Sequence, residues 1–178
     1  MGKNRNIIIS IFLIAIFIGS VNGSTLIINK VRKTYTNEIG IREHGGFNRG
    51  QRVEEYLKAA NLKPGNAWCA AFVTWTFKQC NIKAVISGYS PNWFQSNIVY
   101  KRDDNINRNY KPQPGDVFGL YFESKKRIAH VGFIDSRQGD YYITVEGNTN
   151  EAGSREGDGV YRKRRHVKTI YAISRWIK

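Results

Sequence analysis

The stretch Asn66-Ala67-Trp68-Cys69-Ala70-Ala71-Phe72-Val73-Thr74-Trp75 decides how this chain folds and where its chemistry lies. A turn signal, Pro64-Gly65, precedes it, and a nearly continuous apolar run follows. The pattern predicts a buried helix over about residues 67–80 with Cys69 in its first turn. Free backbone N–H groups and the positive end of the helix dipole meet at that turn, and both favour the thiolate form of a cysteine.

Cys80 is the only other cysteine of the chain. Cys69 and Cys80 are 11 positions apart. If one continuous helix carries both residues, this separation corresponds to roughly 16 Å along the helix axis, whereas a disulfide needs Cα atoms within about 7 Å. We therefore expect two free thiols. Cys80 is predicted to be a small buried apolar residue, and the same interpretation holds for Cys69 unless a base lies beside it.

The N-terminus has the pattern of a secretory signal peptide. Lys3 and Arg5 precede an apolar run from Ile7 to Ile18, and small or polar residues lead to Ser24. The run is shorter than the roughly 20 residues of a membrane-spanning helix. We predict a signal peptide over residues 1–23, with an uncleaved anchor as the alternative. Residues 24–178 are then a single exported domain in the periplasm, the cell envelope or the extracellular space.

The chain is strongly basic. Its 28 Lys and Arg against 14 Asp and Glu give a formal charge of +14, and loss of Lys3 and Arg5 leaves +12. Such a domain is attracted to polyanions. For an exported protein we predict peptidoglycan and anionic cell-wall polymers as partners, and membrane contact only through an uncleaved signal segment. We do not expect nucleic acid as a partner, because the basic residues are interleaved with the predicted strands and are not clustered on one recognition helix. The oligomeric state stays open.

The order of predicted elements indicates an α+β domain. Helical periodicity runs from Leu26 to about Gly40 and again over residues 51–60, ahead of the helix that holds Cys69. Residues 87–115 are expected to be rich in loops, with a short helix near 91–99. Five short strands follow, with a hairpin turn at Gln138-Gly139-Asp140; they are Val117–Phe122, Ile128–Asp135, Tyr141–Glu146, Val160–Arg164 and Ile170–Trp176.

Three histidines compete for the role of base to Cys69. His130 is the best candidate, because it opens a predicted strand in which Gly132 leaves room for another backbone or a ligand. His44 lies in a glycine-rich loop and is expected to be exposed. His166 follows a basic run and is expected to be solvated or part of an anion-binding face. A histidine beside the thiol would lower the thiol pKa from about 8.5.

A base of this kind needs a third group that orients its ring. Glu146 and Asn148 end the strand after His130 and share one face of it, so either residue can serve. The alternative is a turn with Asn148 in the left-handed conformation and Glu146 solvated. Metal-binding spacings such as Cys-x-x-Cys and a phosphate-binding glycine loop are missing from the sequence, so we predict no metal and no cofactor.

Four motifs in this order resemble those of CHAP domains, the cysteine- and histidine-dependent amidohydrolases/peptidases among the papain-like bacterial cell-wall hydrolases. They are Trp68-Cys69-Ala70-Ala71-Phe72-Val73, Pro114-Gly115-Asp116-Val117, Ala129-His130-Val131-Gly132-Phe133-Ile134 and Val145-Glu146-Gly147-Asn148. Residues 38–43 and 48–50 resemble the helix and loop that precede the cysteine in such domains. The resemblance covers about residues 26–176.

The resemblance implies a papain-like α+β fold, with N-terminal helices packed on a C-terminal antiparallel β-sheet. Cys69 would be the nucleophile, His130 the base and Glu146 the orienting group, while Asn148 would assist in orientation or polar stabilisation. Some CHAP domains bind calcium through an acidic loop ahead of the cysteine, but this sequence has no clear Asp-x-Asp cluster there.

Three further residues near these motifs are predicted to bind substrate, namely Trp68, Glu43 and Asn48. The expected function is exported peptidoglycan hydrolysis at an amide bond, by a stem-peptide endopeptidase or an N-acetylmuramoyl-L-alanine amidase. The alternative is a non-catalytic basic module that binds cell wall or membrane and carries an unreactive Cys69. The sequence leaves open which amide is cut and whether the wall is the cell's own, a competitor's or a host's.

Overall fold

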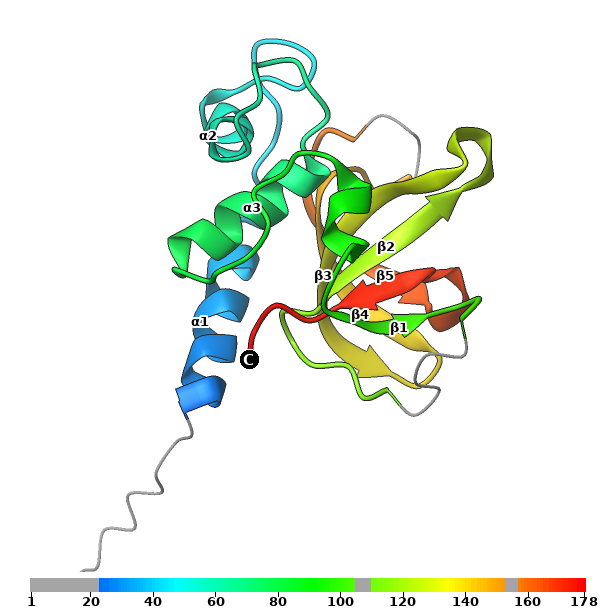
Figure 1. Cartoon of the computed structure of the whole chain (residues 1–178). Coiled ribbons are helices and arrows are strands. Elements are labelled where there is room, and N and C mark those ends of the chain that lie inside the picture. The colour runs from blue at the N-terminus through cyan, green and yellow to red at the C-terminus, as the bar shows by residue number, and fades with distance from the viewer. Residues whose placement is uncertain (1–22, 105–109, 153–156) are drawn as a thin grey trace, which may run out of the picture.

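The computed structural model describes residues 23–104, 110–152 and 157–178. Within them, three α-helices pack on a six-stranded antiparallel sheet (Figure 1). The predicted α+β fold is confirmed. The helices are α1 (Gly23–Thr36), α2 (Gln51–Ala59) and α3 (Cys69–Gln79). The strands are β1 (Ile98–Lys101), β2 (Val117–Phe122), β3 (Arg127–Gln138), β4 (Tyr141–Thr149), β5 (Gly159–His166) and β6 (Ala172–Ser174), in the sheet order β1-β6-β2-β3-β4-β5.

Helix α3 is central, as its apolar sequence predicts. Residues 69–77 are all buried, because α1, α2 and the sheet all pack against this helix (Figure 1). Phe72 and Phe77 set their rings edge-on against Phe133 of β3, with centroids 6.0 and 5.3 Å away. Each such side chain contributes about 1.5–3 kcal/mol on burial. The helix that begins at Cys69 is therefore firmly placed against the sheet.

Helix α1 is tied to the sheet through one buried carboxylate. Asp135 of β3 accepts hydrogen bonds from Arg32 Nε at 2.7 Å and from the Tyr35 hydroxyl at 3.0 Å. Arg162 Nη1 of β5 lies 2.5 Å from the other carboxylate oxygen. Burial raises the pKa of Asp135, but Arg32, Arg162 and Tyr35 outweigh it and the pKa is lowered. The ionised carboxylate thus joins three elements.

Several predicted boundaries are wrong. Helix α1 ends at Thr36, short of the expected stop at Gly40, and only part of its apolar pattern is buried: Leu26 and Ile39 are 57% and 37% exposed. The expected helix near 91–99 is a 3₁₀ helix, η1 (Ser90–Phe94). It is followed by β1, which was not predicted, because a four-residue edge strand that pairs with distant β6 has no local signature.

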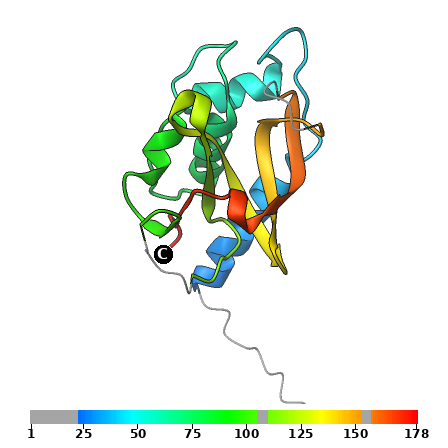
Figure 2. The same cartoon turned by 90° about the vertical axis from the view of Figure 1, so that its right-hand side faces the viewer.

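Both faces of the sheet are buried at its centre. Alternate residues of β2 and β3 point to opposite sides, so Val117 and Phe133 face the helices while Phe118 and Ile134 face a second apolar cluster. That cluster also holds Tyr142, Ile170 and Ile173. With the molecule turned by 90°, the strands lie in front of α3 (Figure 2).

The predicted signal peptide over residues 1–23 lies outside the described residues except for Gly23, which begins α1. Among the helices of the described ranges, none is both long and apolar enough to cross a membrane. The predicted hairpin turn is confirmed, since β3 ends at Gln138, β4 begins at Tyr141 and Gly139 has a positive φ of 57°.

Candidate active site

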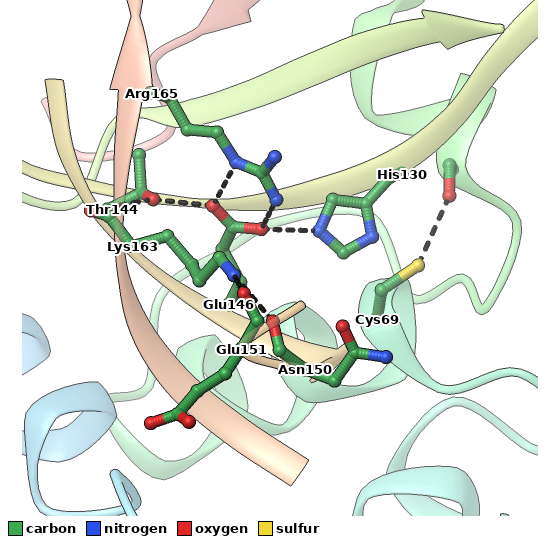
Figure 3. A network of polar contacts seen from close by, with 9 residues as sticks. Cys69, His130, Thr144, Glu146, Asn150, Glu151, Lys163 and Arg165 are labelled. Atoms are coloured by element: carbon green, nitrogen blue, oxygen red, sulfur yellow. Dashed lines mark hydrogen bonds and ion pairs between the residues drawn. The ribbon is translucent and has the colours of Figure 1, made fainter. Parts of the chain in front are cut away.

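Cys69 is the first residue of α3, as predicted. Its side chain is almost fully buried, and its sulfur lies 3.6 Å from the hydroxyl of Ser90 (Figure 3). Phe72 N–H donates to Trp68 O, so the N–H groups of residues 69–71 precede the first N–H group that donates within the helix. Cys80 is also a free, buried thiol, at the far end of α3, so no disulfide joins the two cysteines. Cys69 thus lies among free donors at a helix start.

His130 lies within β3 rather than at its start, since the strand begins at Arg127. Its Nε2 is 2.8 Å from Glu146 Oε2, and its other ring nitrogen is on the side that faces the Cys69 sulfur (Figure 3). Gly132 makes this arrangement possible, because a Cβ there would lie 2.9 Å from Glu146 Cγ and 2.9 Å from Val145 O. The close approach predicted at Gly132 is confirmed.

Glu146 is fully buried and has partners that the sequence analysis did not identify. Arg165 of β5 donates from Nε to Oε1 at 2.8 Å and from Nη2 to Oε2 at 2.6 Å. The Thr144 hydroxyl donates to Oε1 at 2.5 Å. A buried carboxylate requires such compensation. A buried Glu146 carboxylate requires a cationic partner, but which basic residue of β5 fills that role depends on the fold.

The three side chains shift one another's pKa values. Burial alone raises the pKa of the Cys69 thiol, but His130, the Ser90 hydroxyl and the backbone N–H of Val131 lower it to about 7. Burial lowers the pKa of His130, yet Cys69 and Glu146 raise it to about 9. Arg165 and His130 overcome burial and hold the pKa of Glu146 well below its usual range. Near neutral pH the site therefore favours a thiolate and imidazolium pair.

Asn148 has a different role from Glu146. Its φ is +54°, the left-handed conformation of the alternative prediction, but Glu146 is buried and not solvated. Asn148 Oδ1 accepts from the Trp68 N–H at 3.0 Å, and Asn148 Nδ2 donates to Asn48 Oδ1 at 3.0 Å. These hydrogen bonds hold Trp68, the residue before Cys69. The group that contacts the His130 ring is Glu146.

The residues predicted to bind substrate form a closed hydrogen-bonded ring with Asn148. Trp68 Nε1 donates to Glu43 Oε1 at 2.9 Å, and Asn48 N–H donates to Glu43 Oε2 at 2.8 Å. The Trp68 side chain has no exposed surface and Asn48 is 6% exposed. Trp68 and Asn48 are thus buried and lie outside the cavity lining, and their contact with substrate stays a prediction. Glu43 is half-buried, and both of its carboxylate oxygens are engaged within this ring.

A cavity opens beside the sulfur of Cys69. Its lining combines apolar groups with the candidate catalytic residues and two cations; the residues are Ala67, Cys69, Leu120, Phe122, Lys125, Ala129, His130, Asn148, Thr149 and Arg165. His44 is exposed, as expected. His166 is half-buried and accepts the Lys168 N–H at Nδ1. Neither of these two histidines lines the cavity. In the described parts of the chain, no group of three His, Cys, Asp or Glu residues is arranged to hold a metal ion.

An α+β domain that places a cysteine at a helix start against a histidine on the sheet has the architecture of a papain-like hydrolase. The family model described as the CHAP domain matches residues 61–148, which confirms the predicted resemblance to this family. The match includes Cys69, His130, Glu146 and Asn148 and excludes Arg165. No curated protein matches the sequence.

Two similar solved structures are described as the crystal structure of Ly7917 and that of Ly7917 with the hydrolyzing product of MDP. The first is 14% identical, with a TM-score of 0.43, over 83% of this chain and 61% of the other. The second is 15% identical, with a TM-score of 0.45, over 84% and 63%. This chain spans less than two thirds of the length of both.

Proposed function

We propose that this chain is an exported peptidoglycan hydrolase that cleaves an amide bond through the Cys69 thiolate, with His130 as the base. The bond lies within the stem peptide or joins it to the glycan, which makes the protein an endopeptidase or an N-acetylmuramoyl-L-alanine amidase. The observation that carries the proposal is the convergence of Cys69 and His130 at one cavity, with Glu146 buried behind the His130 ring and the pKa of the thiol lowered to about 7.

The reaction follows from the charges of the resting pair. The thiolate attacks the amide carbon, a C–S bond forms, and the carbonyl electrons move to oxygen. When the C–N bond breaks, the His130 imidazolium gives its proton to the leaving amine, which leaves a thioester on Cys69. Water then attacks the thioester and gives a proton to neutral His130. Release of the carboxylic acid restores the thiolate and imidazolium. Glu146 holds the ring in orientation throughout.

Stabilisation of the oxyanion is assigned to the start of α3. The N–H groups of residues 69–71 precede the first hydrogen bond of the helix, and the contact between Trp68 N–H and Asn148 fixes the backbone just before them. Donors that are already in place need no rearrangement when charge develops on the carbonyl oxygen. Removal of one such donor typically costs about 100- to 1,000-fold in rate. Asn148 is thereby a positioning residue for the oxyanion site.

Export and attachment to the wall are supported by the sequence. The signal-peptide pattern of residues 1–23 would deliver the domain outside the cytoplasm, and its formal charge of +12 without Lys3 and Arg5 would attract it to anionic wall polymers. The attraction should weaken as salt rises, because it depends on exposed charges.

The test uses purified peptidoglycan and three proteins: the wild type, Cys69→Ala and the matched control Cys80→Ala. We expect the wild type and Cys80→Ala to release new amines, and Cys69→Ala to remain at background. Equal release by the wild type and Cys69→Ala would sink the cysteine mechanism. An alkylation rate of Cys69 that titrates near the ordinary value of about 8.5 would instead favour a non-catalytic binding module.

A further inference from the structure

One wall of the active-site cavity is cationic. Lys125 and Arg165 line it together with Cys69 and His130. Among the described residues of that lining, no side chain is acidic. The charges of the Cys69 thiolate, the His130 imidazolium, Glu146 and Arg165 cancel, so Lys125 leaves the cavity with one net positive charge.

Arg165 keeps hydrogen-bonding capacity toward the cavity. A guanidinium has five N–H donors, and the contacts of Arg165 with Glu146 use Nε and Nη2. Nη1 lies on the part of the group turned away from the Glu146 carboxylate (Figure 3). The side chain is 23% exposed and lines the cavity. Its position is fixed by the same ion pair that orients His130.

Lys125 supplies the uncompensated charge. It ends the 3₁₀ turn η2 (Glu123–Lys125) between β2 and β3, and its side chain is exposed. Within the described ranges, no acidic side chain forms an ion pair with it. The next residue, Lys126, is also exposed but takes the left-handed conformation, with φ +48°, and does not line the cavity. Of these two adjacent lysines, Lys125 therefore lines the cavity and Lys126 does not.

We propose that Lys125 and Arg165 form a subsite for a carboxylate of the substrate, so that the site takes acidic stem peptides in preference to their carboxamide forms. This inference rests on the proposed function and names its substrate class. A carboxylate accepts charge-assisted hydrogen bonds from both an ammonium and a guanidinium. A carboxamide carries no charge, and its NH₂ group, itself a donor, would face the N–H donors of Lys125 and Arg165 without an acceptor.

The experiment compares one soluble stem peptide in two forms, with its carboxylates free or converted to carboxamides. Calorimetry measures the binding of both forms to the Cys69→Ala protein, and kcat/KM is measured with the wild type. We expect the free acid to be favoured by about tenfold in both measurements, since one charge-assisted contact is worth roughly that factor. The preference should shrink at high salt, because Lys125 is exposed.

Variants of the two adjacent lysines isolate the subsite. We expect Lys125→Gln to remove most of the preference and Lys125→Glu to reverse it. Lys126→Gln, which removes the same charge from the same turn, should keep the preference of the wild type. Both positions are exposed, so these substitutions should not prevent folding.

The outcomes separate the two proposals. Equal affinity and equal kcat/KM for the two peptide forms would overturn the carboxylate subsite while leaving the hydrolase intact, and so would an unchanged preference in Lys125→Glu. Tighter binding of the free acid without hydrolysis by the wild type would support the subsite and overturn the proposed function.

Discussion

Replacement of Glu146 by Gln tests the coupling that makes Cys69 nucleophilic. The Glu146 carboxylate lies 2.8 Å from His130 Nε2 and helps to raise the pKa of that ring to about 9, while His130 lowers the pKa of Cys69 to about 7. The thiolate and imidazolium pair forms as pH rises through the lower value and is lost as pH rises through the upper one. The wild type should therefore show a bell-shaped rate profile with limbs near these two values.

The expected loss follows from the population of that pair. If the two groups titrate independently, about 80% of molecules hold the pair at pH 8. With the ordinary pKa values of about 8.5 for the thiol and about 6.5 for the imidazole, the fraction falls below about 1%. Glu146 is one of two groups that raise the pKa of His130. We therefore expect Glu146→Gln to lose about 10- to 100-fold in rate at pH 8, with the two limbs moving toward each other.

A second variant separates this effect from loss of folding. Glu146→Gln leaves the guanidinium of Arg165 without its buried partner, and such a change typically costs about 3–5 kcal/mol. The double variant Glu146→Gln/Arg165→Met removes both charges and should recover most of the free energy of unfolding in urea. It should not recover the pH limbs of the wild type, because the carboxylate beside His130 is still missing.

The assay is the rate of alkylation of Cys69 by iodoacetamide against pH in a Cys80→Ala background, paired with hydrolysis of a stem peptide. The background leaves one reactive thiol, so the rate reports Cys69 alone. Folded single and double variants that keep the limbs and rates of the wild type would refute the role assigned to Glu146.

Three further substitutions address other parts of the structure. Asn148→Gly keeps the backbone at φ +54° but removes the acceptor for Trp68 N–H, so we expect kcat to fall about tenfold or more with a smaller change in KM; equal kcat would contradict the positioning role. Gly132→Ala should lower both kcat and the free energy of unfolding, the latter by about 1–3 kcal/mol, because the new Cβ meets Glu146 Cγ; a wild-type melting curve and rate would show that this approach is unimportant. Asp135→Asn should destabilise the fold at neutral pH. The pKa of Asp135 is lowered in the folded state, so its contribution is present above about pH 4 and lost below it, and urea unfolding of variant and wild type should converge in acid. A constant difference down to pH 2 would contradict this.

Local patterns were sufficient for the elements that carry the candidate catalytic residues. The apolar run after Pro64-Gly65 predicted a helix with Cys69 in its first turn, and the structure begins α3 at that residue. Alternating residues on both sides of Gly139 predicted the hairpin that brings His130 and Glu146 together. These features depend on short-range periodicity and turn chemistry, which a single sequence contains.

The partners that complete the site depend on long-range pairing. Arg165 stands opposite Tyr142 in the register of β4 and β5, whereas Glu146 stands opposite Tyr161. The long side chain of Arg165 extends along the sheet to reach Glu146. The strand register alone would therefore not have identified Arg165 as the partner of Glu146. Ser90 is close to Cys69 only because η1 folds back on the sheet beside α3.

The residues predicted to bind substrate lie outside the cavity lining for a different reason. The sequence motifs place Trp68, Glu43 and Asn48 near the cysteine, but they do not say which way a side chain points. In the fold, Trp68 stacks on Tyr56 with ring centroids 5.5 Å apart, and its indole N–H is held by Glu43. These residues therefore support the start of the helix, and none of the three lines the cavity.

The most direct test of the central claim is mass spectrometry of the soluble fragments released from purified peptidoglycan. If Cys69 cleaves an amide, the wild type produces fragments with one added water, a new amino group and an intact glycan linkage, and Cys69→Ala produces none. Fragments cut within the glycan, or the same fragments from Cys69→Ala, would contradict the account.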